Sequence, residues 1–389
     1  MKIIIFHMII FVAESISLVI TSRPFTNCKA LNNLRTSKPQ TGLVEYIPGD
    51  IDSKIILTAP HGGKRIETNG SKEIIPRRCP NQWRKCPWVS IIDAYTIDIL
   101  KGAAQEIELK TGKRPHMIIS HLNRNRMDPN RDLQSATQRL MNGKIVKGHP
   151  LAIKVYKEYH SAIVHAKQIV KKGIIFDIHG QGIENKTQLG YILNKVELGN
   201  RQFDIFRTSV GALAKRHAWS SLDAQNLLFG SNSLGGYLEK YGLPAVPSPK
   251  NLEPGMMYNP KSKYKKYKFF RGGFTVQCHG PQNNGEIDAV QMELPSELRL
   301  KREGNDDSKR NNVGQAVGNA ISEFYDYWYK DDQDSNKEIF EHISKYELKS
   351  SLYSESTSYD VQWLTKLGAK INVSIENLNP SLKLLLNKP

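Results

Sequence analysis

The architecture follows from two short segments, Lys54-Ile-Ile-Leu-Thr-Ala-Pro-His-Gly-Gly63 and Gly173-Ile-Ile-Phe-Asp-Ile-His-Gly180. Each contains an apolar run rich in β-branched residues, which predicts a buried strand. Each run leads into a histidine and a glycine, and glycine lets the backbone turn where a strand ends. Two histidines that leave neighbouring strands at one edge of a sheet can face the same point.

Strand-like and helical runs alternate along most of the chain. Further strands are expected at 116–120, 189–193 and 287–294, and apolar residues at helical spacing occur in 89–109, 151–172 and 313–328. This alternation predicts an α/β fold with three layers, in which helices flank a mixed and mostly parallel sheet. We expect a lead-in segment at 23–50, one large domain at 51–330 and a C-terminal extension at 331–389.

The balance of charges points to an acidic partner. The 389 residues include 55 Lys and Arg against 38 Asp and Glu, a formal net charge of +17. A surface this basic favours a small acidic substrate or an acidic polymer. Nucleic acid is not expected, because the sequence contains no zinc-finger pattern and no RNA-binding motif with interleaved aromatic residues.

The N-terminus has the pattern of a secreted protein. Lys2 precedes an apolar stretch of about ten residues, which predicts a signal peptide at 1–22. No later run is long and apolar enough to form a stable membrane span. Three triplets match the glycosylation pattern, at Asn69, Asn185 and Asn372. We therefore expect an extracellular glycoprotein.

The cysteines fit the same compartment. Four are present, and four cysteines in a secreted chain allow three disulfide pairings. They are Cys28, Cys79, Cys86 and Cys278. Cys79 and Cys86 are close enough to clip a loop, whereas the absence of a Cys-x-x-Cys pair disfavours a zinc knuckle.

Polar residues at the ends of the expected strands indicate a metal centre. Catalytic zinc often uses two histidines and a carboxylate, and His61 and His179 would supply the imidazoles. The carboxylate is expected near His61, from Glu67 in the same loop or from Asp93, and the spacing leaves both open. Asp177 is expected to orient His179.

A second carboxylate is the candidate for proton transfer. Glu293 closes the apolar run 287–294 and shares a strand face with Gln291. A carboxylate in an apolar strand must be paired, solvated or functional. We therefore predict that Glu293 takes a proton from water and passes it to the leaving amine.

The loop after residues 116–120 is rich in groups that bind carboxylates. Arg126, Asn130 and Arg131 form a set of fork-like donors, and guanidinium binds a carboxylate through two parallel hydrogen bonds. We expect these three residues to bind the substrate and Asp128 to hold one of the arginines in place.

Taken in order, these motifs resemble the N-formylglutamate amidohydrolase family. The resemblance rests on Ala59-Pro-His-Gly-Gly63, Asp93-Ala-Tyr-Thr96, Asn123-Arg-Asn-Arg-Met-Asp-Pro-Asn-Arg131, Asp177-Ile-His-Gly180 and Gln291-Met-Glu-Leu-Pro295. That family is similar to zinc carboxypeptidases and aspartoacylase-like enzymes. The resemblance implies a phosphorylase/hydrolase-like fold, metal-binding His61 and His179, a carboxylate-binding loop with Arg126, Asn130 and Arg131, and a catalytic Glu293.

Residues and resemblance together predict a secreted zinc amidohydrolase that cleaves an N-acyl or amide bond of an acidic, glutamate-like substrate. A catalytically weak extracellular protein that binds matrix or other polyanions on the same scaffold is the alternative. A serine hydrolase is disfavoured, because the chain has no G-x-S-x-G motif.

Overall fold

The structure is a computed structural model, and it describes only part of the chain. The described residues are 28, 31, 34, 36, 38–66, 89–141, 144–216, 221–252, 254, 269–281, 285–300 and 307–330. The expected signal peptide and C-terminal extension lie outside these residues, as do Glu67, Cys79 and Cys86 and the triplets at Asn69 and Asn372. Asn185 lies within them and is exposed.

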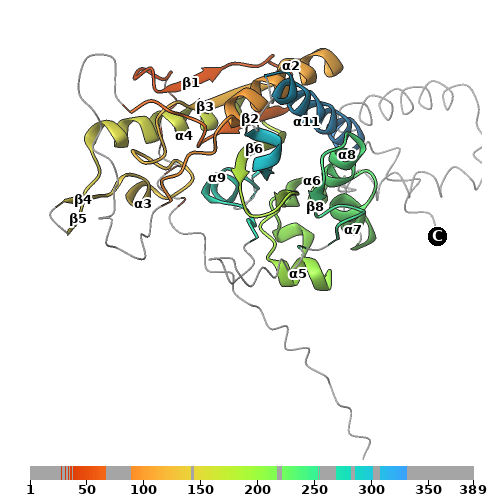
Figure 1. The fold of residues 1–389 in the computed structure, drawn as a ribbon. Helices are drawn as coiled ribbons and strands as arrows, with labels where there is room; N and C mark the ends of the chain where they lie inside the picture. Colours follow the sequence, from red (N-terminus) through yellow and green to blue (C-terminus); the bar gives the residue numbers. More distant parts are fainter. Residues whose placement is uncertain are drawn as a thin grey trace, which may run out of the picture.

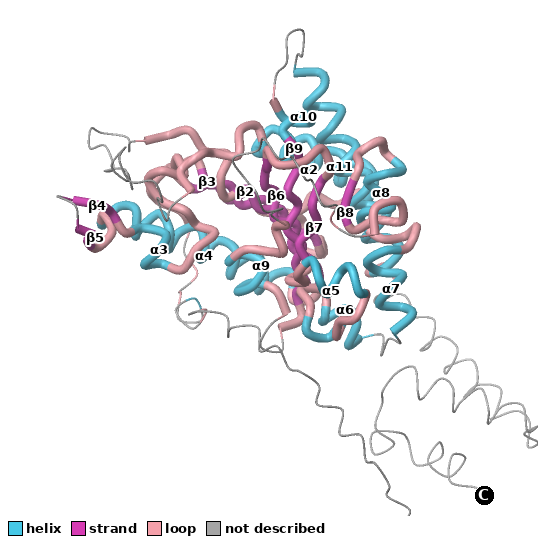
Figure 2. The backbone as a smooth tube through the Cα atoms, turned by 60° about the horizontal axis from the view of Figure 1, so that its bottom comes forward, coloured by secondary structure: helices cyan, strands magenta, loops and turns pink. Residues whose placement is uncertain are grey.

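A mixed sheet is the centre of the molecule. Its strands are β1 (Val44–Ile47), β2 (Ile55–Ala59), β3 (His116–Ser120), β6 (Gly173–Gln181), β7 (Thr187–Gly190), β8 (Ala245–Val246) and β9 (Ile287–Pro295). Within the described residues they form a seven-stranded sheet in the order β1-β3-β2-β6-β9-β7-β8. Only the β1–β3 and β7–β9 pairs of this sheet are antiparallel. A separate hairpin pairs β4 (Arg139–Met141) with β5 (Lys144–Val146). Figure 2 shows β2, β6, β9 and β7 side by side.

Helices cover both faces of the sheet. The longer ones are α2 (Thr96–Thr111), α4 (Pro150–Val170), α7 (Ser221–Phe229) and α11 (Asp307–Trp328). The shorter ones are α3 (Leu133–Thr137), α5 (Lys195–Asn200), η1 (Ile205–Arg207), α6 (Gly211–Arg216), α8 (Leu234–Lys240), α9 (Phe274–His279) and α10 (Ser296–Arg299). In Figure 1, α2 and α11 run together, and α8 packs beside α11.

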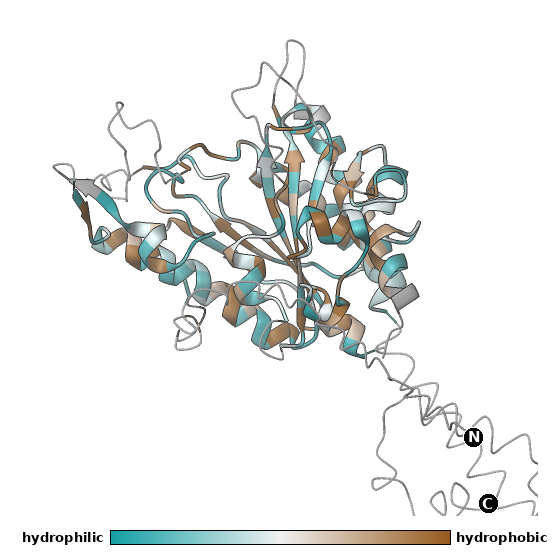
Figure 3. Ribbon diagram, turned by 90° about the horizontal axis from the view of Figure 1, so that it is seen from below, coloured by the Kyte–Doolittle hydropathy of each residue, from teal (hydrophilic) through white to brown (hydrophobic). Residues whose placement is uncertain are grey.

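Each face of the sheet has its own apolar core. Ile174, Phe176 and Ile178 of β6 pack with residues of α2 and α11, whereas Ile175 packs with residues of α4 and α9. This alternation means that β6 is buried on both faces, which is why parallel strands read as continuous apolar runs. Figure 3 colours the ribbon by hydropathy and shows brown, hydrophobic stretches in the central sheet and in the helices beside it. The predicted three-layer α/β class is confirmed.

Several predicted boundaries differ from the structure; the strand expected at 189–193, for example, is β7, Thr187–Gly190. Residues 44–47, expected in a polar lead-in, form the edge strand β1, which is short and holds a half-buried glutamate instead of an apolar run. The helix predicted to begin at residue 89 begins at Thr96, because Tyr95 has a left-handed backbone with φ 66°.

The position of Gly180 after His179 suggested that the chain turns there, but it does not turn. β6 continues to Gln181, so His179 lies on the strand. A side chain on Gly180 would overlap the guanidinium of Arg299, so glycine is needed there for close approach.

One disulfide joins distant parts of the chain. Cys28 pairs with Cys278, with 5.3 Å between the two Cα atoms and a sequence separation of 250. This bond ties the expected lead-in to the end of α9. No helix in the described ranges is both long and apolar enough to cross a membrane.

Candidate metal centre

Adjacent strands and one loop bring three predicted residues together. His61 follows β2, His179 lies on β6, and β2 and β6 are parallel neighbours. Asp93 comes from the loop before α2, where its backbone N–H donates to the carbonyl of His61 at 3.0 Å. The site therefore forms at the carboxyl ends of the strands, where α/β sheets usually bind ligands.

The three side chains present one atom each to a common point. His61 Nδ1 lies 3.1 Å from His179 Nδ1, and each of these nitrogens lies 3.2 Å from Asp93 Oδ2. All three residues are buried. This His/Asp/His group could hold a metal ion. Asp93 is one of the two carboxylates expected here, and because Glu67, the other, is not among the described residues, the choice of Asp93 over Glu67 stays a prediction.

The opposite nitrogen of each imidazole is held by a carboxylate. His61 Nε2 lies 2.7 Å from Asp128 Oδ1, and His179 Nε2 lies 2.8 Å from Asp177 Oδ2. The second oxygen of Asp177 accepts a hydrogen bond from the Thr58 hydroxyl at 2.6 Å. Carboxylates that accept from one imidazole nitrogen leave the other free to bind a metal, and they fix the ring orientation.

This arrangement could hold a cation at its centre. With Nε2–H donated to Asp128 and Asp177, both Nδ1 atoms carry lone pairs, and these face each other and the Asp93 carboxylate. Three acceptors at this separation repel one another unless a proton or a metal ion lies among them. The donor set, two imidazoles and one carboxylate, is that of catalytic zinc sites.

The pKa values of His179, Asp93 and Asp128 are shifted in the directions that favour a protonated imidazole and ionised carboxylates. Burial by itself would lower the pKa of His179, but the Asp177 carboxylate and the hydrogen bond to Asp93 raise it to about 10. Burial would raise the pKa of Asp128 and of Asp93, yet the neighbouring His61 and Arg124 hold both well below the usual range.

Arg124 is a site residue that the sequence reasoning missed. Its Nε donates to Asp128 Oδ2 at 3.1 Å, and its NH1 donates to Asp93 Oδ1 at 3.3 Å. Asp128 was expected to hold Arg126 or Arg131, and its two carboxylate oxygens contact His61 and Arg124. The four-residue spacing of Arg124 and Asp128 is a weak signal that could have suggested the pair.

Glu293 lies beside the cluster. It is on β9, directly opposite His179 in the parallel pairing of β6 and β9. The Gln291 side-chain amide donates to Glu293 Oε1 at 2.8 Å, so the two residues share one strand face as predicted. Burial, together with the charges of Asp93 and Asp177, raises the pKa of Glu293 to about 7 against the opposing influence of His179 and Arg124.

The three residues expected to bind substrate lie in the loop that carries Asp128. Asn130 Oδ1 accepts from the Thr275 backbone N–H at 2.9 Å, and Asn130 Nδ2 lies 3.3 Å from His179 Nε2. Arg131 NH1 donates to the Asn130 carbonyl at 2.7 Å and is half-buried. Arg126 is buried, and its NH1 donates to the Asn125 side chain at 3.0 Å.

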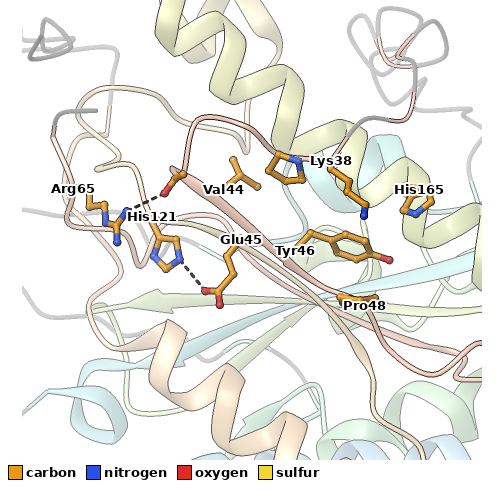
Figure 4. Close-up of a pocket in the computed structure, with 10 residues that line it drawn as sticks. Lys38, Val44, Glu45, Tyr46, Pro48, Arg65, His121 and His165 are labelled. Atoms are coloured by element: carbon orange, nitrogen blue, oxygen red, sulfur yellow. Dashed lines mark hydrogen bonds and ion pairs between the residues drawn. The ribbon is translucent and has the colours of Figure 1, made fainter. Parts of the chain in front are cut away.

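A separate pocket runs along the edge strand. Figure 4 shows Arg65, His121 and Glu45 towards one end and Tyr46, His165 and Lys38 towards the other. Its volume is about 790 Å³, and Pro39, Gly42, Val44 and Pro48 complete its lining. None of these lining residues belongs to the metal centre.

Comparison with known proteins gives distant structural likenesses. No family model matches the chain, and no curated protein matches it. An N-formylglutamate amidohydrolase from Ralstonia eutropha JMP134 is 12% identical, covers 72% of this chain and 97% of its own, and has a TM-score of 0.38. The gene product Atu2144 from Agrobacterium tumefaciens is 11% identical over 74% of this chain and 96% of its own, with a TM-score of 0.35. At this distance, the activity has to be inferred from the chain's own residues.

Proposed function

We propose that this chain is a secreted, zinc-dependent amidohydrolase that cleaves an N-acyl or amide bond of an acidic, glutamate-like substrate. The observation that carries the proposal is the convergence of His61 Nδ1, His179 Nδ1 and Asp93 Oδ2 beside the buried Glu293 carboxyl. Three protein ligands with a proton carrier at hand are the components of a zinc hydrolase site.

The ligand spacing suits zinc. Nitrogen and oxygen ligands lie about 2.0–2.2 Å from zinc, so two of them at a tetrahedral angle are roughly 3.4 Å apart. The three atoms here are 3.1–3.2 Å from one another. A zinc ion in such a site polarises a carbonyl and activates water at neutral pH.

The protein's own groups prepare the site for this chemistry. Asp128 and Asp177 keep the two imidazoles turned towards the centre. Glu293 can both accept and release a proton near neutral pH, because its pKa is raised to about 7. Gln291 holds the Glu293 carboxyl by donating to Oε1. This hydrogen bond leaves Oε2 as the oxygen that receives the proton.

The substrate preference follows from the adjoining loop and from the resemblance of the motifs to N-formylglutamate amidohydrolases. We assign Arg126 and Arg131 to the substrate carboxylate, which a guanidinium binds in two places at once. Asn130 belongs to the same loop, and its side chain connects that loop to α9 through the Thr275 N–H.

Secretion is part of the proposal, and the disulfide supports it. Cys28 and Cys278 are bonded in the structure, and disulfides persist mainly in oxidising compartments. Placed there, the enzyme would act on acidic amino-acid derivatives or on acidic termini of larger molecules outside the cell.

The test is metal content and hydrolysis measured together. Purified full-length protein should hold about one zinc per chain and hydrolyse N-formyl- or N-acetylglutamate faster than the matching glutamine derivatives, which lack the side-chain carboxylate. His179→Ala should lose both zinc and activity, whereas the control His165→Ala, a histidine on α4 outside the centre, should keep both. Equal zinc and activity in the two variants would refute the proposal. Tight binding of polyanions by zinc-free protein would favour the scaffold alternative.

A further inference from the structure

Arg299 connects the three segments that carry the site. It ends α10, directly after β9, and is buried. Its guanidinium donates to three backbone carbonyls: Nε to Leu294 at 3.0 Å, NH1 to Ala94 at 2.7 Å and NH2 to Gln181 at 3.1 Å. These carbonyls come from a loop, from β6 and from β9, which are far apart in sequence.

Each of the three carbonyls belongs to a residue within two positions of a residue of the site. Ala94 follows Asp93, Leu294 follows Glu293, and Gln181 is two residues beyond His179. One rigid, planar group therefore sets the relative positions of a candidate ligand loop, a candidate ligand strand and the strand of the candidate proton carrier. A guanidinium suits this task because its donors have a fixed fork geometry.

The backbone of β6 leaves space for the Arg299 guanidinium at Gly180. Gly180 lies between His179 and Gln181, and a Cβ there would overlap Arg299 Cζ and its nitrogens. The Gly180 N–H donates to Asp93 Oδ2 at 3.1 Å, so the same residue touches a candidate ligand on one side and the arginine on the other. Gly180 and Arg299 thus form one packing unit behind the metal centre.

We propose that Arg299 is a positioning residue that sets the geometry of the metal centre by joining the Asp93, His179 and Glu293 segments. The proposal rests on the proposed function, because it assigns the centre to zinc. Loss of Arg299 leaves three carbonyl groups without this partner, and the segments are then free to shift relative to one another. A shift of this kind separates ligand atoms that now lie 3.1–3.2 Å apart.

The first experiment measures zinc affinity by competition with a chelator. In Arg299→Met we expect zinc to bind about tenfold to a hundredfold more weakly, the usual effect of losing a group that orients metal ligands. Arg299→Lys should not restore the affinity, because an ammonium lacks the fork that reaches three separate carbonyls. Unchanged affinity in Arg299→Met would overturn the proposal.

The matched control is Arg216→Met. Arg216 is also an arginine near a buried carboxylate, since its NH2 lies 3.4 Å from Asp288 Oδ2, but it is on α6, and its NH1 donates to the Glu286 carbonyl just before β9. It should lower thermal stability while zinc affinity stays within twofold of the wild type. If both variants lose affinity in proportion to their loss of stability, Arg299 is structural only, and the proposal fails.

A second experiment needs no metal. Gly180→Ala should lower the unfolding midpoint of the metal-free protein, because the new methyl group overlaps the guanidinium. In an Arg299→Ala background the same substitution should lower the midpoint much less, since the overlapping group is gone. Equal shifts in both backgrounds would show that the two residues do not act as a unit.

The two experiments separate the proposals. If wild-type protein binds no zinc, the proposed function fails, whatever the two-residue cycle shows. If wild-type protein binds zinc and the Arg299→Met protein binds it equally well, only the positioning role fails.

Discussion

Asp93 and Glu293 are both buried carboxylates close to His179, and their surroundings differ. Asp93 points at both imidazoles and receives the Gly180 N–H and Arg124, which stabilise its charge. Glu293 receives a neutral amide from Gln291, and burial raises its pKa to about 7. A carboxylate kept ionised suits a metal ligand, whereas one that titrates near neutrality suits proton transfer.

This difference predicts that Glu293→Gln keeps the metal and loses the reaction. The amide has nearly the same shape and cannot carry the proton, so we expect kcat to fall about 10²–10⁴-fold with zinc content unchanged. Zinc analysis and hydrolysis rates on the same sample check this. Glu184→Gln, which changes another buried glutamate outside the site, is the control and should keep normal rates. Zinc loss in Glu293→Gln would show instead that Glu293 is a ligand.

Some site residues could be predicted from the sequence, and others could not. His61, His179 and Glu293 follow or lie on buried strands, and apolar runs reveal such strands directly. Asp93 and Arg124 lie in loops, and a loop position depends on contacts with distant segments, such as the bond from the Asp93 N–H to the His61 carbonyl. Spacing along the chain therefore could not choose between Glu67 and Asp93.

The same contrast holds for the larger elements. The strand expected at 116–120 is β3 without change, and the helix expected at 151–172 is α4, where Pro150 and the His149 cap begin the helix. β1 was missed because an edge strand of four residues has no long apolar run. The start of α2 was missed because the helix begins after Tyr95, which has a positive φ. The spacing of the apolar residues does not reveal this backbone angle.

The contact between α4 and α9 predicts a loss of stability in acid. His160 Nδ1 lies 2.8 Å from His279 Nε2, both residues are buried, and His160 Nε2 donates to the Pro129 carbonyl. Burial lowers the pKa of His160 to about 3, and burial with the nearby His160 and Lys167 lowers the pKa of His279 well below its usual value. Both imidazoles are therefore neutral in the folded protein.

The unfolded chain takes up these protons at higher pH than the folded one. The contribution of this pair to the free energy of unfolding is therefore fully present above pH 6.5, and it is lost as the pH drops towards about 3. Each imidazole contributes a slope of about 1.4 kcal/mol per pH unit in this window. Urea unfolding between pH 7.5 and 4.5 should show a shallower slope for His279→Gln than for the wild type. Gln277→Ala on α9, which removes no titrating group, should keep the wild-type slope. Identical slopes in His279→Gln and wild type would contradict the assignment of a neutral pair.

At the scale of the whole molecule, one covalent bond joins the first described residue, Cys28, to α9. The Cys28–Cys278 disulfide closes a loop of 250 residues and attaches the segment before β1 to α9, on the sheet face covered by α4. Chain-entropy arguments for so long a loop give roughly 5 kcal/mol of stabilisation, and measured disulfides typically give about 2–4 kcal/mol.

The paired variant Cys28→Ser with Cys278→Ser should therefore unfold roughly 5–15 °C below the wild type. Thermal unfolding followed by circular dichroism checks this, and the serine variant is preferable to a reductant, which would also reach Cys79 and Cys86. Zinc content should not change, since neither cysteine contacts the metal centre, and an unchanged midpoint would mean that the bond does not constrain the unfolded chain.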